Sequence, residues 1–349
     1  MSSNKQTEFL NKKVVITGAS SGIGKACALY FLNQGANVCL CGRDTNTLKK
    51  IGEKFPGQVS IMKIDLTDDL QTFDLKSSVI ESLKGVEIMI NCAHIKFDGD
   101  LEKTFPQDYD YMMDVNLRSI YILLSSFNIY FKKYDTSIVN VSCLYGSKPM
   151  SGLTGYCMTK SGLEMLTKFA AAEFAVDGIR VNAVTCCPVD SLSQTYVGVS
   201  DTEYNSFKSR VSSNIPLGRM ANPEDIAKVI VFLASKRSSS ITGQIVKVDG
   251  GRSLTTSGWV PWRGMLNMNS RFEPDGLKPM LKLKEFYSKY THGEKSVSNV
   301  YPTKDEEIEK LIEESNWSTR LIDAHDKLSA NYKNIEKNDE FLITNYVKK

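Results

Sequence analysis

The stretch Thr17-Gly-Ala-Ser-Ser-Gly-Ile-Gly24 decides the fold, because it follows the apolar run Val14-Val-Ile16 and opens the amphipathic segment Gly22–Asn33. Glycines there allow a tight turn and a close backbone approach, so that a pyrophosphate can meet the free N–H groups of a helix start. Glycine turns also end strands for purely structural reasons, and the motif alone leaves that alternative open. The order strand, glycine loop, helix predicts a nucleotide-binding α/β unit. Its candidate cofactor contacts are Gly18, Ser20, Ser21, Gly22, Ile23 and Gly24.

Outward from this loop, short β-rich runs alternate with amphipathic segments. This alternation predicts a parallel sheet with helices on both faces, because parallel strands need crossover connections. In such sheets ligands bind outside the carboxyl ends of the strands, so we expect a site where these runs end. The apolar runs are Val14–Ile16, Asn37–Cys41, Val59–Ile64, Val86–Ile90, Ser137–Val141, Ile179–Val184 and Gln244–Val248, and the helical patterns include Gly22–Asn33, Tyr109–Phe131 and Tyr156–Val176.

The pattern changes after Gly251. Irregular sequence rich in Pro, Gly and Trp is followed by a capping-box pattern, Thr303-Lys-Asp-Glu306, ahead of helical periodicity. We therefore divide the chain into a short tail (1–11), a dinucleotide-binding domain (12–254) and a mainly helical and irregular C-terminal extension (255–349). The extension cannot easily form a core alone, so we expect it to pack on the domain or on a partner subunit.

The composition argues against several classes of function. The chain has 43 basic and 40 acidic residues without a dense Lys/Arg block, so no nucleic-acid partner is expected. The longest uncharged apolar stretch, Ser119–Phe131, is shorter than the roughly 20 residues of a membrane span and is interpreted as a buried helix. All eight cysteines lie between Cys27 and Cys187 without a C-x-x-C spacing. We therefore expect no metal site and a reducing, cytoplasmic location.

The second predicted strand ends in Gly42-Arg43. A site that selects NAD places an acid there, whereas an arginine can hold a ribose 2′-phosphate through two parallel hydrogen bonds. Ser20 and Ser21 can add hydroxyl contacts. We therefore predict NADP(H) in preference to NAD(H), with a solvated surface arginine as the alternative. Asp65 closes the third strand and is expected near the adenine, although Asp-Leu-Thr-Asp68 is also an ordinary helix cap.

A phenol and an ammonium are four residues apart in Tyr156-Cys-Met-Thr-Lys160, on one face of a predicted helix. A tyrosine with a pKa near 10 is a poor acid or base at neutral pH. An ammonium about 5 Å away, at an effective dielectric constant of about 20, stabilises the phenolate by roughly 3 kcal/mol. That lowers the pKa of the phenol by about two units, into a useful range for acid–base catalysis.

Further motifs share a fixed order with this pair over residues 12–251, roughly seven tenths of the chain. The set is Thr17-Gly-x-x-x-Gly-x-Gly24, Asn91-Cys-Ala, Val115-Asn116, Tyr156-x-x-x-Lys160 and Ile241-Thr-Gly-Gln with Asp249-Gly-Gly. In order and spacing they resemble the short-chain dehydrogenase/reductase family. The resemblance implies a doubly wound, seven-stranded Rossmann-type sheet, a nicotinamide dinucleotide and a proton relay between solvent and the substrate oxygen.

The resemblance also implies roles for single residues. Tyr156 would be the general acid in reduction and the general base in oxidation, and Lys160 would lower its pKa and hold the nicotinamide ribose. Asn116 would hold a water that links Lys160 to solvent. Asn91 would lie at the cofactor, and Pro188 would border the nicotinamide carboxamide.

Three positions depart from the family's pattern. The family has a serine 13 residues before the tyrosine, where this chain has Cys143. The adjacent Ser142 cannot simply replace it, because neighbouring side chains of a strand point to opposite faces. His94 stands where a glycine is usual, as a structural substitution or as a group near the substrate. Cys187-Pro188-Val189 replaces an expected Pro-Gly.

The resulting prediction is an NADP(H)-dependent oxidoreductase that reduces a ketone or aldehyde, or oxidises a secondary alcohol, through Tyr156, Lys160 and Asn116. The alternative is a cofactor-binding regulatory or scaffold protein with decayed catalysis, because a thiol is a weak hydrogen-bond donor. Family members usually pair through the helices that correspond to Tyr109–Phe131 and Tyr156–Val176. This implies a homodimer or homotetramer, although a monomer's buried helix would have a similar sequence.

Overall fold

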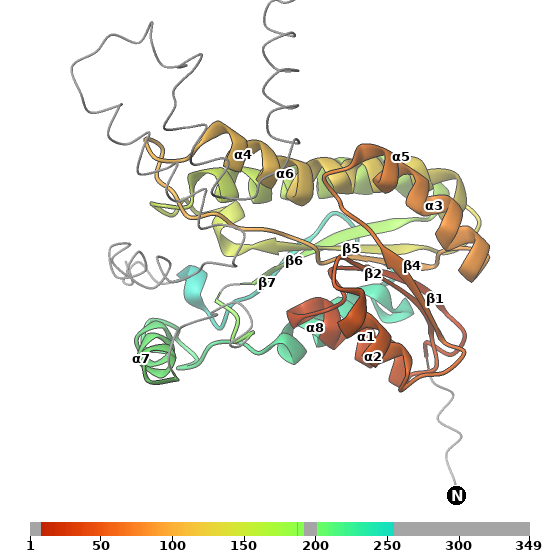
Figure 1. The fold of residues 1–349 in the computed structure, drawn as a ribbon, viewed down its shortest axis with the longest axis horizontal. Helices are drawn as coiled ribbons and strands as arrows, with labels where there is room; N and C mark the ends of the chain where they lie inside the picture. Colours follow the sequence, from red (N-terminus) through yellow and green to blue (C-terminus); the bar gives the residue numbers. More distant parts are fainter. Residues whose placement is uncertain (1–7, 187, 192–200, 255–349) are drawn as a thin grey trace, which may run out of the picture. The chain divides into compact units, whose positions relative to one another are not determined.

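The computed structural model describes residues 8–186, 188–191 and 201–254. Their seven strands form one sheet in the order β3-β2-β1-β4-β5-β6-β7, and all neighbouring strands are parallel (Figure 1). The predicted doubly wound, seven-stranded Rossmann-type sheet is confirmed. The strands are β1 Lys13–Thr17, β2 Asn37–Gly42, β3 Val59–Lys63, β4 Ile88–Asn91, β5 Ser137–Cys143, β6 Arg180–Cys186 and β7 Ile245–Val248.

Helices cover both faces of this sheet (Figure 1). The helices α1, α2 and α8 lie on one face, and α3, α4, α5 and α6 lie on the other. A π-helical turn, Asp114–Arg118, joins α4 to α5, so the predicted helix Tyr109–Phe131 is one continuous helical segment with an irregular middle. The bounds are α1 Gly22–Asn33, α2 Thr45–Gly52, α3 Asp69–Leu83, α4 Pro106–Met113, α5 Ser119–Phe131, α6 Thr154–Phe174, α7 Asp201–Ser212 and α8 Pro223–Ala234.

Each face of the sheet has its own apolar core. Val14 and Ile16 of β1 belong to the core that contains residues of α1 and α8, whereas Val15 between them belongs to the core under α3 and α5. Successive side chains of a strand point to opposite faces, so a parallel strand covered on both sides must be apolar at every position. This explains why the strand sequences are continuous apolar runs.

The strand order places a crevice next to the glycine loop. The chain leaves β1 through α1 to reach β2 on one side, whereas β4 pairs with β1 on the other side. The strand order therefore reverses between β1 and β4. Sheets of this type bind ligands outside the carboxyl ends of the strands at such a switch point.

The expected buried helix is confirmed, whereas the expected C-terminal extension is not described by the structure. The stretch Ser119–Phe131 is helix α5, whose inner side chains are buried in the core as predicted. Within the residues that the structure describes, no helix is long and apolar enough to cross a membrane. The predicted C-terminal extension, 255–349, lies outside the described residues.

The core beneath α5 makes a measurable contribution to stability. Phe131 is fully buried and stacks on Phe127. We expect Phe131→Ala to lower the free energy of unfolding by about 3–5 kcal/mol, because truncation of a buried ring loses apolar burial and leaves a cavity. Chemical denaturation monitored by circular dichroism measures this change. The control is Leu70→Ala on α3, where the side chain is exposed and the expected change is within about 0.5 kcal/mol. Equal losses in both variants would contradict this assignment of the core.

Candidate active site

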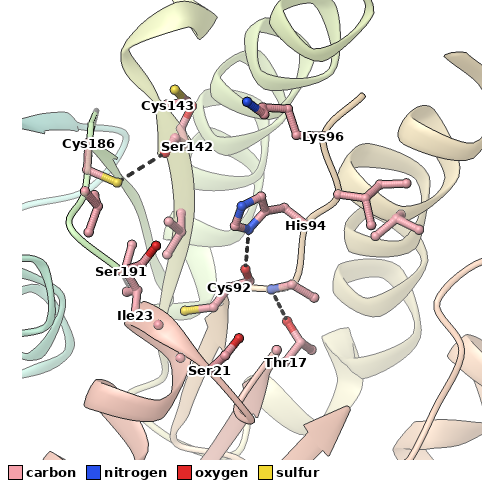
Figure 2. A pocket seen from close by; sticks show the side chains of 18 of the residues that line it. Thr17, Ser21, Ile23, Cys92, His94, Lys96, Ser142, Cys143, Cys186 and Ser191 are labelled. Carbon is pink, nitrogen blue, oxygen red and sulfur yellow. Dashed lines mark hydrogen bonds between the residues drawn. The ribbon is translucent and has the colours of Figure 1, made fainter. Parts of the chain in front are cut away.

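A cavity of about 730 Å³ opens at the carboxyl ends of β1, β2, β4, β5 and β6. Figure 2 shows side chains from these strand ends and from the glycine loop converging on it. The cavity brings together most of the predicted site residues, although Asn91 and Asn116 do not line it. The predicted residues that line it are Gly18, Ser20, Ser21, Gly22, Ile23, Gly24, Arg43, Asp65, Ser142, Cys143, Tyr156, Lys160 and Pro188.

The glycine loop requires glycine at two positions. Gly18 has a φ of +67°, and a Cβ there would lie 2.8 Å from the backbone of Ala93 beyond β4. A Cβ on Gly24 would lie 2.2 Å from the carbonyl oxygen of Gly18. Ser21 begins α1 without a side-chain capping bond in the described structure. The first-turn N–H groups of α1 therefore border the cavity without a side-chain cap, which suits an anion such as a pyrophosphate.

The end of β2 presents a positive charge to the cavity. Arg43 is exposed and donates a hydrogen bond to the hydroxyl of Tyr111 at 3.1 Å. The neighbouring Asp44 accepts hydrogen bonds from the backbone of Asn46 and from the hydroxyl and backbone of Thr47, so its carboxylate caps α2. These bonds, with that from the Thr47 hydroxyl the strongest, hold the pKa of Asp44 below its ordinary value. The carboxylate of Asp44, which follows Arg43 in the sequence, is therefore already occupied in capping α2.

Asp65 also serves a local structural purpose. Its carboxylate accepts from the backbone and hydroxyl of Thr67, at 3.0 and 2.8 Å. The residue that caps α3 is instead Asp68, which accepts from the backbone of Gln71. Asp65 therefore lines the cavity while forming a tight turn after β3.

Tyr156 and Lys160 lie in the first turns of α6, and both are buried at the cavity wall. The Lys160 Nζ lies 5.7 Å from the centre of the Tyr156 ring and donates to the carbonyl of Val141 at 2.9 Å. Burial lowers the pKa of Lys160, whereas Cys143, Cys186, Cys92 and Glu164 act in the opposite direction. The expectation that the phenol and the ammonium share one helix face at the strand ends is met.

Ser142 and Cys143 point in different directions. The hydroxyl of Ser142 donates to Glu164 Oε1 at 2.9 Å, away from Tyr156. Cys143 packs against Tyr156 together with Leu153. The thiol therefore occupies the place beside the phenol, as strand alternation predicts.

Glu164 is a residue that the sequence analysis did not single out. Its carboxylate is buried and accepts from both Ser142 and Thr185, at 2.9 and 3.2 Å, which ties the ends of β5 and β6 to α6. A Cβ on Gly146 would lie 2.8 Å from the same carboxylate oxygen. Its position one turn after Lys160 on the same helix face was the available signal.

Asn116 lies in the π-helical turn and binds the chain segment that forms one wall of the cavity. Its side chain accepts from the backbone N–H of Ile95 and donates to the carbonyl of Ile95, both at 2.8 Å. It also donates to the hydroxyl of Thr159 at 3.1 Å. Such π-turns occur frequently at functional sites.

The side chain of Asn91 points towards the helices that pack on the sheet. It donates to Asn140 at 2.8 Å, and Asn140 donates to Thr167 of α6 at 2.9 Å. Its side chain thus connects β4, β5 and α6.

His94 faces the cavity, with its ring centre 6.4 Å from that of Tyr156 (Figure 2). Its Nδ1 lies 3.1 Å from the carbonyl oxygen of Cys92. A carbonyl can only accept, so Nδ1 carries the proton and Nε2 is left as an acceptor. The surrounding protein, followed by the positive charge of Lys160, lowers the pKa of His94 to about 4. This shift leaves the imidazole neutral at pH 7.

Apolar side chains line the part of the cavity beyond Tyr156. They come from the loop before α6, from α7 and from the segment after α7, and the charged Lys96 and Arg252 also reach the cavity. Residues 192–200, between β6 and α7, lie outside the described structure. The apolar lining residues here are Tyr145, Met150, Leu153, Phe207, Val211 and Met220.

The protonation of His94 can be measured directly. The chain has three histidines, so the ring C–H signals in a proton NMR titration are few, and the His94 signal is the one that His94→Gln removes. We expect this signal to titrate well below the ordinary pKa of about 6.5. In the folded state the neutral form is favoured, so this residue's contribution to stability decreases as pH falls from about 6.5 towards 4. Titration at or above 6.5 would contradict the buried environment assigned to the ring.

The comparisons with known proteins agree with this geometry. The sequence profile of a family described as enoyl-(acyl carrier protein) reductase matches residues 18–253. A 3-oxoacyl-[acyl-carrier-protein] reductase of Thermotoga maritima is 36% identical over 246 residues, which cover 69% of this chain and 97% of the relative. A meso-2,3-butanediol dehydrogenase of Serratia marcescens is 31% identical over 249 residues, which cover 71% of this chain and 96% of the relative. The chain therefore belongs to the short-chain dehydrogenase/reductase family of oxidoreductases.

Proposed function

We propose that this enzyme is an NADP(H)-dependent reductase of ketones or aldehydes, or a dehydrogenase of secondary alcohols, that uses Tyr156, Lys160 and Asn116. The observation that carries the proposal is the position of Tyr156 and Lys160 in the wall of a cavity that also contains the glycine loop. The names of the relatives, a 3-oxoacyl reductase and a butanediol dehydrogenase, describe reactions at a carbonyl or secondary alcohol carbon.

The residues present fit a dinucleotide. A volume of about 730 Å³ is within the range of about 300–1,000 Å³ that is typical of ligand pockets. Gly18 and Gly24 allow the close backbone packing of the loop, and the uncapped start of α1 would face a pyrophosphate. When bound, the nicotinamide supplies or accepts the hydride. Pro188 lines the cavity and would border the carboxamide.

Tyr156 moves the proton in this proposal. In reduction its hydroxyl donates to the carbonyl oxygen of the substrate, and in oxidation its phenolate accepts the proton of the alcohol. The ammonium of Lys160, 5.7 Å from the ring centre, favours the phenolate. Burial strengthens this interaction, because charges interact more strongly in a low dielectric than in water.

The proposed relay passes near Asn116. Its bonds to Ile95 and Thr159 connect the cavity wall at Ile95 with helix α6. We retain the proposal that it orders a water that links Lys160 to solvent. Asn91 would act indirectly, because its hydrogen bond to Asn140 aligns β4 with β5.

We assign NADP(H) in preference to NAD(H) from the end of β2. Arg43 is exposed at the cavity, and Ser20 lies beside Gly42, so a cation and a hydroxyl are available for a 2′-phosphate. Asp44 caps α2, which removes the nearest carboxylate from competition for a ribose hydroxyl. Asp65, which lines the cavity, would contact the adenine.

The substrate in this proposal is a small molecule with an apolar part. Its carbonyl would lie beside Tyr156 and Cys143, and its apolar part would lie among Leu153, Phe207 and Met220. The exposed apolar side chains of α5 and α6, including Tyr121 and Phe169, favour pairing of these helices in a homodimer or homotetramer. We keep the division into residues 1–11, 12–254 and 255–349, and a cytoplasmic location, as parts of the proposal.

One observation favours a second candidate, a cofactor-binding regulatory or scaffold protein. Cys143 provides only a weak hydrogen-bond donor beside Tyr156. Loss of one good donor to a developing oxyanion typically reduces turnover by about 10²–10³. Under this second proposal the cavity binds the dinucleotide while turnover is vestigial.

Replacement of the phenol separates the two candidates. We expect Tyr156→Phe to lower kcat by about 10²–10⁴ while the dissociation constant of NADPH stays nearly constant, because only the proton donor is removed. The assay follows NADPH oxidation with a panel of ketones and aldehydes. Tyr30→Phe on α1, where the side chain is exposed and does not line the cavity, is the matched control and should keep full turnover. Equal rates in wild type and Tyr156→Phe would reject the reductase and leave the scaffold proposal.

Replacement of Arg43 tests the cofactor assignment. We expect Arg43→Ala to weaken NADPH binding about 10–100-fold, because hydrogen bonds to charged groups contribute about 1.5–3 kcal/mol. Binding of NADH should change little. Fluorescence titration with both dinucleotides measures the difference, and Arg237→Ala, which does not line the cavity, is the control. A similar loss of affinity for NADH and NADPH would contradict a 2′-phosphate contact.

A further inference from the structure

Two thiols occupy the ends of adjacent strands at the cavity. In the register of β5 and β6, Cys143 lies directly opposite Cys186. Neighbouring strands are about 4.8 Å apart, and the Cα atoms of a disulfide are usually about 4.4–6.8 Å apart. The backbone spacing of this pair is therefore suited to a disulfide.

The preceding register pair shows which way the thiols face. Ser142 and Thr185 lie opposite each other, and both donate to Glu164 on α6. Side chains alternate along a strand, so the next pair, Cys143 and Cys186, turns away from Glu164 and towards the cavity. Both thiols line that cavity, and the Cys186 Sγ donates to the carbonyl of Ser142, the residue before Cys143, at 3.8 Å (Figure 2).

The two thiols have different electrostatic surroundings, which would give them different reactivities. Cys143 lies near enough to interact with the ammonium of Lys160, and a neighbouring cation increases the reactivity of a thiol. Burial, followed by the neighbouring Cys143, raises the pKa of Cys186 well above its ordinary value. Cys186 is therefore a protonated thiol at neutral pH. Peroxide is small enough to enter through the cavity that both thiols line.

We propose that Cys143 and Cys186 form an oxidation-sensitive dithiol that hydrogen peroxide converts to a cross-strand disulfide. The thiolate of Cys143 attacks one peroxide oxygen, the O–O bond breaks, and the hydroxide that leaves takes up a proton as water. The sulfur of Cys186 then attacks the sulfenic acid of Cys143, and the S–S bond forms. The hydroxyl of the sulfenic acid leaves with the Cys186 proton as a second water. Two thiols are oxidised, and one peroxide is reduced to two waters.

The bond would change the catalytic cavity. Cys143 packs against Tyr156, and a disulfide requires its side chain to rotate about the Cα–Cβ bond towards β6. Formation of the bond removes the thiol hydrogen of Cys143 and moves its side chain away from the phenol. Loss of turnover on oxidation rests on the proposed function, whereas formation of the disulfide does not.

The experiment maps the cross-link in the full chain. Protein treated with hydrogen peroxide is alkylated, digested with trypsin without reduction and analysed by tandem mass spectrometry. Trypsin does not cleave the Lys148–Pro149 bond, so Cys143 falls in the tryptic peptide 134–160 together with Cys157. Cys186 falls in the peptide 181–208 together with Cys187, and fragment ions within each peptide identify the linked cysteine. We expect these two peptides to be linked through Cys143 and Cys186, and dithiothreitol to separate them. Linkage through Cys157 or Cys187, linkage of Cys143 to another peptide, or irreversible oxidation of Cys143 without linkage would overturn the proposal.

Variants provide a second readout that needs no catalytic rate. Cys186→Ala should abolish the cross-link, whereas the adjacent Cys187→Ala should retain it. In Cys186→Ala the sulfenic acid on Cys143 has no thiol at position 186 to react with. It should therefore be oxidised further to sulfinic acid, which dithiothreitol does not reverse. If the enzyme is active, turnover relative to each variant's own untreated rate should recover with dithiothreitol in wild type and not in Cys186→Ala. An inactive wild type that still forms the linked peptides would reject the proposed function and leave the dithiol intact.

Discussion

One buried ammonium determines much of the chemistry available at this cavity. Removing a charged amine from water costs several kcal/mol unless polar groups compensate it. Lys160 receives that compensation from the carbonyl of Val141 and from the electron-rich groups near it. Because Val141 belongs to β5 and Lys160 to α6, the charge is correctly placed only when strand and helix pack in this register. The fold therefore fixes the position of the charge, and the charge in turn acts on Tyr156.

The acid one turn further along α6 secures the same register from the other side. Glu164 accepts from Ser142 of β5 and Thr185 of β6, so one carboxylate aligns two strand ends that border the cavity. Loss of an acceptor would leave two buried hydroxyls unsatisfied, each costing about 1–3 kcal/mol. Positions near a site can thus be constrained by hydrogen bonding although they never touch a ligand.

The sequence was informative where backbone geometry dictates the residue type. The glycine loop and the strand runs were interpreted correctly, because a Cβ on Gly18 or Gly24 would collide with backbone and because doubly covered strands must be apolar. The directions of Asn91 and Asn116 were not predictable, since each depends on partners far along the chain. Glu164 was overlooked for the same reason. A single sequence shows the spacing on a helix but not which strands lie beneath it.

Two of the departures from the family's pattern, His94 and Cys143, lie near the same ammonium, and their effect is electrostatic. His94 has a depressed pKa partly because Lys160 is close, so it responds to the same field that would stabilise a phenolate on Tyr156. Thiols and a neutral imidazole are weakly polar neighbours, which screen that field less than hydroxyls and water would. Substitution of Cys143 for a serine weakens a hydrogen bond but does not remove the charge on which the phenol depends. Tyr156 would therefore still be able to donate and accept a proton, although Cys143 would stabilise the oxyanion less than a serine does.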